Sequence, residues 1–71
     1  MKIDFGCGKK KKDGFVGVDI LKLEGVDIVH DLSIIPYPFK NSIAEEIWMD
    51  NVLEHIKDPL KVIEELHRIG K

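Results

Sequence analysis

A short apolar run that stops at Gly6-Cys7-Gly8 is the feature that most constrains the fold of this chain. Glycine has no side chain and tolerates positive φ, so a strand that ends in two glycines brings bare backbone close to whatever lies beyond it. A second apolar run, residues 15–19, ends in Asp19, eleven residues after Gly8. A carboxylate in that place can accept hydrogen bonds from the two hydroxyls of a ribose. Together the two runs predict a nucleotide site.

Length and composition limit the domain organisation and the partners. The 71 residues provide for one small domain, residues 1–71, and the net charge of -2 gives no reason to expect nucleic acid or a membrane surface as partner. One cysteine excludes an internal disulfide. No apolar run approaches the roughly 18 residues of a membrane span, and the first residues lack the pattern of a signal peptide. We expect a soluble, cytoplasmic chain.

Four apolar runs predict strands, at residues 2–5, 15–20, 26–29 and 46–49. We expect the second and third to lie in the interior of the sheet. Trp48 alternates with apolar neighbours in the fourth run, which predicts a core position. The lysine-rich segment 9–14 predicts a solvated loop, and two prolines within residues 32–41 exclude a regular element there.

The last third of the chain carries helix signals. Asp58-Pro59 is typical of a helix start and Gly70 of a helix end. Glu64 stands four residues before Arg68, a spacing that stabilises helices. Residues 52–56 predict a separate helical turn. Apolar side chains at three-residue steps predict one buried stripe: Leu60, Ile63, Leu66 and Ile69, with Val62 beside them.

This order of elements predicts an α/β fold, a partial Rossmann-like open sheet of about four mostly parallel strands with a C-terminal helix. Ligands of such sheets bind at the carboxyl ends of the strands. Only nine residues, 6–14, join the first two strands, whereas a parallel crossover usually contains a helix. At about 3.3 Å per extended residue these nine still run back along a short strand. We therefore expect a loop in place of the first helix.

The segment Asp4-Phe5-Gly6-Cys7-Gly8 resembles the first motif of the Rossmann-like (class I) S-adenosylmethionine-dependent methyltransferases, in which an acidic residue leads into Gly-x-Gly. The resemblance covers nearly the whole chain, which is similar to the N-terminal half of the methyltransferase type 11-like branch of that family. Further motifs follow in the family's order and spacing: Asp19, His30-Asp31-Leu32, Pro36-Tyr37-Pro38-Phe39 and Val52-Leu53-Glu54-His55-Ile56.

The resemblance implies the cofactor-binding half of a methyltransferase that uses S-adenosylmethionine and acts on a small-molecule or sugar-type acceptor. Seven residues would surround the cofactor, in four groups. Asp4, Gly6 and Gly8 would line its methionine part, and Asp19 would hold the ribose hydroxyls. Asp31 would accept from the adenine amino group, with the Leu32 backbone N–H near the ring, and Asp50 would face the sulfonium.

The reacting end has three catalytic candidates, Asp50 and Asn51 by this resemblance and His55 as a general base by the chemistry of histidine. Methyl transfer is an in-line displacement that depends mainly on proximity and orientation, so it needs no covalent nucleophile. We predict no metal site, because His30 and His67 lack the spacing of metal ligands and a single cysteine does not complete a zinc set.

Each of these features also has a structural interpretation. Asp19 and Asp31 suit the capping of loops, because a short carboxylate bonds to nearby backbone. The lysines at 9–12 suit a solvated loop or contact with an anionic substrate, and His55 suits packing or capping. At the level of function, one alternative is a non-catalytic interaction module that forms homo-oligomers through the open edge of the fourth strand. A nicotinamide dehydrogenase fits less well, since Lys11 stands where its third glycine belongs.

Overall fold

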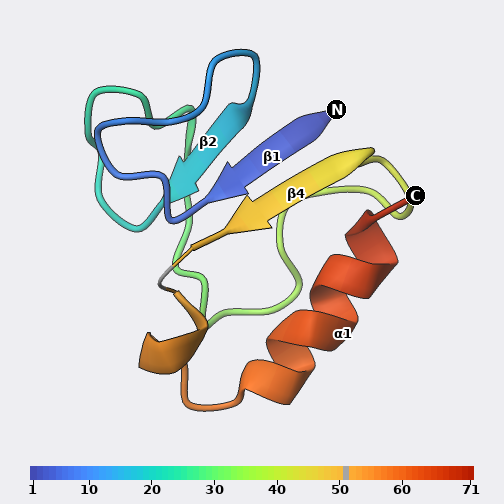
Figure 1. Cartoon of the computed structure of the whole chain (residues 1–71). Coiled ribbons are helices and arrows are strands. Elements are labelled where there is room, and N and C mark those ends of the chain that lie inside the picture. Colours follow the sequence, from blue (N-terminus) through green and yellow to red (C-terminus); the bar gives the residue numbers. More distant parts are fainter. Residues whose placement is uncertain (51) are drawn as a thin grey trace.

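The computed structural model describes residues 1–50 and 52–71, which form a four-stranded sheet with one α-helix packed against it (Figure 1). The strands are β1 (Lys2–Phe5), β2 (Val16–Asp19), β3 (Ile28–Val29) and β4 (Glu46–Met49). A 3-10 helix, η1 (Leu53–His55), follows β4, and α1 (Pro59–Ile69) comes last. The sheet order is β3-β2-β1-β4 and every pair is parallel, which confirms the predicted fold class.

Strand β1 lies at the centre of the molecule, because its residues pair with β2 on one side and with β4 on the other. All four strands run the same way, so their carboxyl ends open on one edge of the sheet. The connection from β1 to β2 is a loop with turns, as its length predicted. The prediction that the third strand is interior was wrong. β3 forms an edge of the sheet and Val29 is exposed, because nothing pairs beyond it among the described residues.

One face of the sheet carries the hydrophobic core, together with α1 and the segment 32–43. The Phe5 ring lies 5.1 Å from that of Tyr37 and 5.9 Å from that of Phe39, centroid to centroid, so the loop packs directly under β1. Burying a large apolar side chain contributes about 1.5–3 kcal/mol. The buried apolar side chains of this cluster are Ile3, Phe5, Val18, Leu32, Tyr37, Ala44, Val62 and Ile69.

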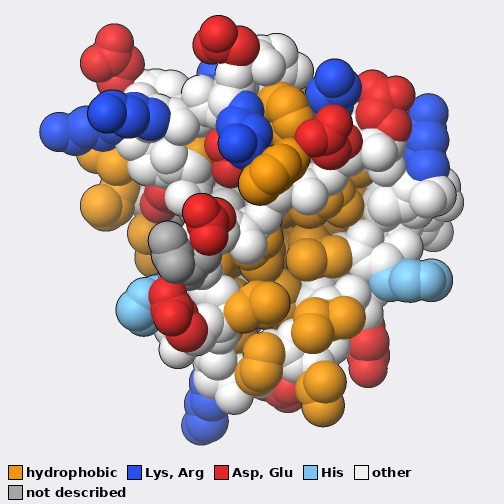
Figure 2. All heavy atoms as spheres, viewed as in Figure 1, with side chains coloured by type: hydrophobic (Ala, Val, Ile, Leu, Met, Phe, Trp, Pro, Cys, Tyr) orange, Lys and Arg blue, Asp and Glu red, His pale blue; other side chains and the backbone are white. Residues whose placement is uncertain are grey.

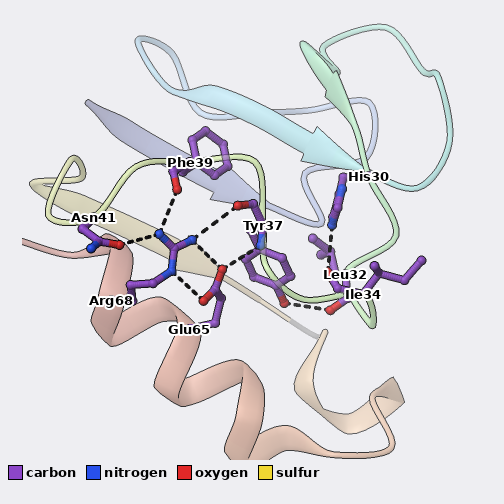
Figure 3. Close-up of polar contacts among 8 residues, drawn as sticks. All are labelled: His30, Leu32, Ile34, Tyr37, Phe39, Asn41, Glu65 and Arg68. Carbon is purple, nitrogen blue, oxygen red and sulfur yellow. Dashed lines mark hydrogen bonds and ion pairs between the residues drawn. The ribbon is translucent and has the colours of Figure 1, made fainter.

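A buried ionic network fastens α1 to the loop 37–41 (Figure 3). The Glu65 side chain, in a residue only 6% exposed, accepts two hydrogen bonds from Arg68 at 2.6 and 2.7 Å and one from the backbone N–H of Tyr37 at 2.6 Å. Arg68 also donates to the carbonyl of Phe39 and to the side chain of Asn41. Arg68 therefore pairs with Glu65, three residues before it, rather than with Glu64, four residues before it, as the spacing predicted.

Helix α1 begins and ends where the sequence predicted. Asp58 caps it by accepting from the Lys61 backbone N–H, Pro59 occupies the first turn, and Gly70 follows the last. The predicted apolar stripe was partly wrong, since Leu60 is 70% and Ile63 50% exposed. Steps of three residues drift by about 60° each around a helix with 3.6 residues per turn, so the buried face follows Val62, Glu65 and Ile69 instead. No helix in the described residues is long and apolar enough to cross a membrane.

The opposite face of the sheet is covered by loops alone. Asp4 of β1 stands between Gly17 of β2 and Trp48 of β4 in the register, and the segments around residues 7–12 and 25–27 lie over this region. These segments do not reach far over β4, and Trp48 stays 43% exposed. The predicted core position of Trp48 was therefore wrong.

The outer edge of β4 is paired only at its start. Ala44 donates to the carbonyl of Ile69 at 2.9 Å and accepts from the N–H of Lys71 at 2.8 Å, in a parallel bridge. Because backbone groups of alternate residues point the same way, those of Glu46 and Trp48 face the open side of the strand. Figure 2 shows hydrophobic side chains gathered on this side of the molecule, over β4 and α1.

Candidate functional site

A cavity of about 640 Å³ lies at the carboxyl edge of the sheet, within the range of about 300–1,000 Å³ typical of small-molecule sites. It gathers residues that are distant in the sequence, because the ends of all four strands meet there. Among the predicted site residues it brings together Asp4, Gly6, Asp19, Asp31, Leu32, Asp50 and His55. Gly8 is not part of the cavity wall, and Asn51 lies outside the described residues.

The glycine turn has the positive φ that its sequence predicted, 71° at Gly6 and 60° at Gly8. The two glycines are needed for different reasons. A Cβ on Gly6 would lie 2.3 Å from Cγ2 of Val52. The Val52 side chain therefore excludes any residue larger than glycine at position 6. A Cβ on Gly8 would meet no atom within 4 Å.

Asp19 ties the end of β2 to the glycine turn. Its Oδ2 accepts from the Gly8 backbone N–H at 2.8 Å, and its Oδ1 accepts from the Ile20 backbone N–H at 2.7 Å. This is the loop-capping role that the sequence left open for this residue. Its Oδ1 also accepts from the Leu21 backbone N–H at 3.4 Å. A carboxylate has about four lone-pair sites, so Asp19 keeps capacity for about one donor from a ligand.

Asp4 and Asp31 also hold loops while they line the cavity. Asp4, 7% exposed, accepts from the Lys12 backbone N–H at 3.1 Å, which anchors the lysine-rich loop over β1. Asp31 accepts from the hydroxyl and the backbone N–H of Ser33, and these two bonds hold the pKa of its carboxyl below the usual value. Asp31 is therefore ionised at neutral pH. Three carboxylates thus share one hollow, which the geometry of parallel strand ends predicted.

Two of the three residues expected at the reacting end belong to the described residues. Asp50, exposed at the end of β4, and His55 of η1 both line the cavity. The His55 ring is 3.7 Å from a carboxylate oxygen of Glu54, and both side chains are largely exposed. An exposed histidine beside one carboxylate has no built environment for proton transfer, so the structure gives His55 a place on the wall and no further role.

Several lining residues were not predicted as site residues from the sequence. Lys10, Lys12 and Trp48 form part of the wall, as do Cys7, Ile20, Ser33, Val52 and Ile56. The lysines carried a signal, since a charge run directly after a glycine turn lies near the ligand edge. Trp48 had none, because its alternation with apolar neighbours is typical of a core residue.

Cys7 contributes a protonated thiol to the wall. Burial raises the pKa of this thiol, and the nearby carboxylates of Asp4 and Asp19 raise it further. A thiol without a lowered pKa is a poor nucleophile. Among the described residues, no group of three His, Cys, Asp or Glu side chains is close enough to hold a metal ion.

A second hollow, of about 720 Å³, lies between the loop after β3 and the start of α1. It contains none of the predicted site residues, and it shares Ser33 and Ile56 with the first cavity. Its wall is formed by Ser33, Ile35, Ile56, Lys57, Asp58, Lys61 and Val62.

Comparisons with protein-family models, with curated proteins and with solved structures found no match to this chain. What the cavity binds is therefore inferred from its own residues.

Proposed function

We propose that this chain binds S-adenosylmethionine in the cavity at the carboxyl edge and supports methyl transfer to a small-molecule acceptor. One observation carries the proposal: Asp4, Asp19 and Asp31, from the ends of three different strands or just beyond them, line a single cavity beside the Gly6 turn. A cytoplasmic location belongs to the same proposal.

By the resemblance to the methyltransferases, we assign the parts of the cofactor to the cavity residues. Asp31, after β3, would accept from the adenine, and Asp19, at the end of β2, from the ribose; both keep acceptor capacity beyond their loop contacts. Asp4, on central β1, would line the methionine part. The bound group would supply an electrophilic methyl on a sulfonium, and the four cavity aspartates, Asp4, Asp19, Asp31 and Asp50, favour that cation electrostatically.

The protein's contribution to transfer is orientation. Positioning two reactants side by side removes much of the entropic barrier of a displacement. Asp50 lies at the end of β4, next to β1 in the sheet, so an acceptor placed there lies beside the group held by Asp4.

Titration calorimetry with S-adenosylhomocysteine tests the proposal. We expect saturable binding to the wild type. In Asp19→Ala the affinity should fall about tenfold or more, because a hydrogen bond to a charged group contributes about 1.5–3 kcal/mol. Asp27→Ala is the matched control. Asp27 also accepts from a backbone N–H, that of Gly17 at 2.8 Å, and lies outside the cavity. Absent heat with the wild type, or equal losses in both variants, would contradict the proposed contacts.

A second candidate function is an interaction module that assembles through β4. It is favoured by the outward-facing backbone of Glu46 and Trp48 and by the exposed Leu60 and Ile63 of α1. Sedimentation at high concentration should then show dimers in the wild type and in Glu46→Ala, and monomers in Glu46→Pro, which lacks the outward N–H. Proline is tolerated on an edge strand. A monomeric wild type would remove this candidate.

A further inference from the structure

Lys12 is held at both ends over the exposed face of the sheet. Its backbone N–H donates to Asp4 Oδ2 at 3.1 Å, and its Nζ lies 3.9 Å from the centroid of the Trp48 ring. Asp4 and Trp48 are opposite each other in the β1–β4 register, so their side chains stand on the same face. Lys12 therefore bridges two neighbouring strands at the cavity wall.

The two lysines at positions 11 and 12 differ in how their charge is met. Lys11 forms an ion pair with Asp27 at 2.8 Å, outside the cavity. Lys12 has no carboxylate within ion-pair distance in the described part of the chain, and its ammonium rests on an aromatic face instead. A cation–π contact orients an ammonium without neutralising it. The charge of Lys12 is thus fixed in place and still available to an anion.

The charged side chains of the cavity differ along the order of the strands. Asp19 and Asp31 follow β2 and β3, whereas the β1 and β4 side holds both signs, with Lys12 on the Trp48 ring together with Asp4 and Asp50. Lys10 lines the same cavity. Asp4 Oδ2 accepts from the Lys12 backbone N–H, whereas the Lys12 ammonium has no carboxylate partner among the described residues. A ligand seated against β2 and β3 leaves the Lys12 ammonium for a second molecule.

We infer that Lys12, positioned by Trp48 and assisted by Lys10, forms an acceptor subsite that binds a carboxylate or phosphate group of the molecule to be methylated. The inference rests on the proposed function, because it places the acceptor beside the cofactor. Ammonium to carboxylate or phosphate bonds are charge-assisted and stronger than neutral ones. The acceptor class is accordingly an anionic small molecule rather than a neutral sugar.

Trp48 is the only tryptophan of the chain, so its fluorescence reports directly on this subsite. The protein, saturated with S-adenosylhomocysteine, is titrated with benzoate, with phenyl phosphate and with neutral benzamide. We expect saturable changes with an anion at about tenfold lower concentration than with benzamide, since one charge-assisted hydrogen bond is worth roughly that factor. Tighter binding of benzoate identifies a carboxylate acceptor, and tighter binding of phenyl phosphate a phosphorylated one.

Lys12→Met should lower the affinity for the anionic probe about tenfold, to the affinity measured for benzamide. Lys12→Arg keeps the charge and should retain binding, which also shows that the loop tolerates substitution. Lys9→Met is the matched control, because Lys9 belongs to the same run but does not line the cavity. Equal binding of benzoate, phenyl phosphate and benzamide, or no effect of Lys12→Met, would overturn the subsite.

One further outcome separates the two proposals. The substitution Lys12→Met could weaken the binding of S-adenosylhomocysteine but not that of methylthioadenosine, which lacks the amino-acid part. In that case Lys12 binds the cofactor's own carboxylate, and the acceptor subsite is rejected. The proposed function stands in that case. If the wild type binds neither nucleoside, the proposed function fails and the acceptor subsite fails with it.

Discussion

The two sides of the sheet differ in how polar groups are satisfied. On the α1 side, the buried Glu65 and the partly buried Arg68 bond to one another and to the loop 37–41. At the carboxyl edge, carboxylates such as Asp19 and Asp31 bond to backbone one to eleven residues away and still line an open cavity. The first region is built to hold one conformation, and the second keeps charge available.

This difference indicates where the stability of a small domain resides. A chain of this size buries a modest fraction of its surface, so each core contact carries a large share of its stability. Exposed polar side chains of the cavity can then be changed at a smaller cost to folding than residues beneath the sheet. Five substitutions probe where the stability lies.

Phe5→Ala should have the largest effect. Phe5 is fully buried and packs on Tyr37 and Phe39, and removing a buried phenylalanine costs about 3–5 kcal/mol. In a marginal domain this is enough to unfold most of the population at 25 °C. Far-ultraviolet circular dichroism in urea measures it. A loss below about 1 kcal/mol would show that the core is not the main source of stability.

Glu65→Gln should cost about 2 kcal/mol, because it weakens a buried charge-assisted network. Hydrogen bonds from Arg68, and then from the Tyr37 backbone, lower the pKa of Glu65 from its ordinary 4.5. A lowered folded-state pKa gives stability that is present above pH 4.5 and is lost as the pH falls through the folded value. The difference in the free energy of unfolding between wild type and variant should therefore become smaller below pH 4.5. Urea titrations at several pH values measure it. The exposed neighbour variant Glu64→Gln should show no such difference.

Gly6→Ala should cost more than Gly8→Ala. Both glycines have positive φ, for which alanine pays about 1–2 kcal/mol. Only at Gly6 does the added Cβ also collide with Val52. Thermal unfolding of both variants gives the difference, and equal losses would mean that Val52 moves aside freely.

Ile63→Ser should have the smallest effect, within about 0.5 kcal/mol, since the side chain is half exposed on α1. Urea unfolding at low protein concentration measures the monomer. If the loss of stability relative to the wild type grows with protein concentration, Ile63 is buried in an assembly. That result would support the interaction module.

Local patterns sufficed for much of this fold. The strand-glycine-strand pattern, the Asp58-Pro59 start and the meeting of Asp4, Asp19 and Asp31 at one edge all follow from rules that act over a few residues or from parallel strand geometry. Whether those residues bind a cofactor stays a prediction.

The errors arose where tertiary contacts override pattern. Trp48 is 43% exposed because the loop between β1 and β2 reaches β4 only with the Lys12 side chain, and no local signal states which face lacks a cover. The buried face of α1 includes Glu65, which is made acceptable by Arg68 together with a partner 28 residues earlier, the Tyr37 N–H. The free edge position of β3 likewise depends on what pairs beyond it.

The short segment from Ile43 to Glu45 joins the two ends of the chain. The Met1 amino group donates to the Ile43 carbonyl, Glu45 donates to the Met1 carbonyl, and Lys71 donates to Ala44. Both termini are thus held against the same segment, just before β4. Detaching either terminus would destabilise the contacts of the other, so a peptide linker between Met1 and Lys71 should preserve them in a circular permutant whose new termini lie in the lysine-rich loop.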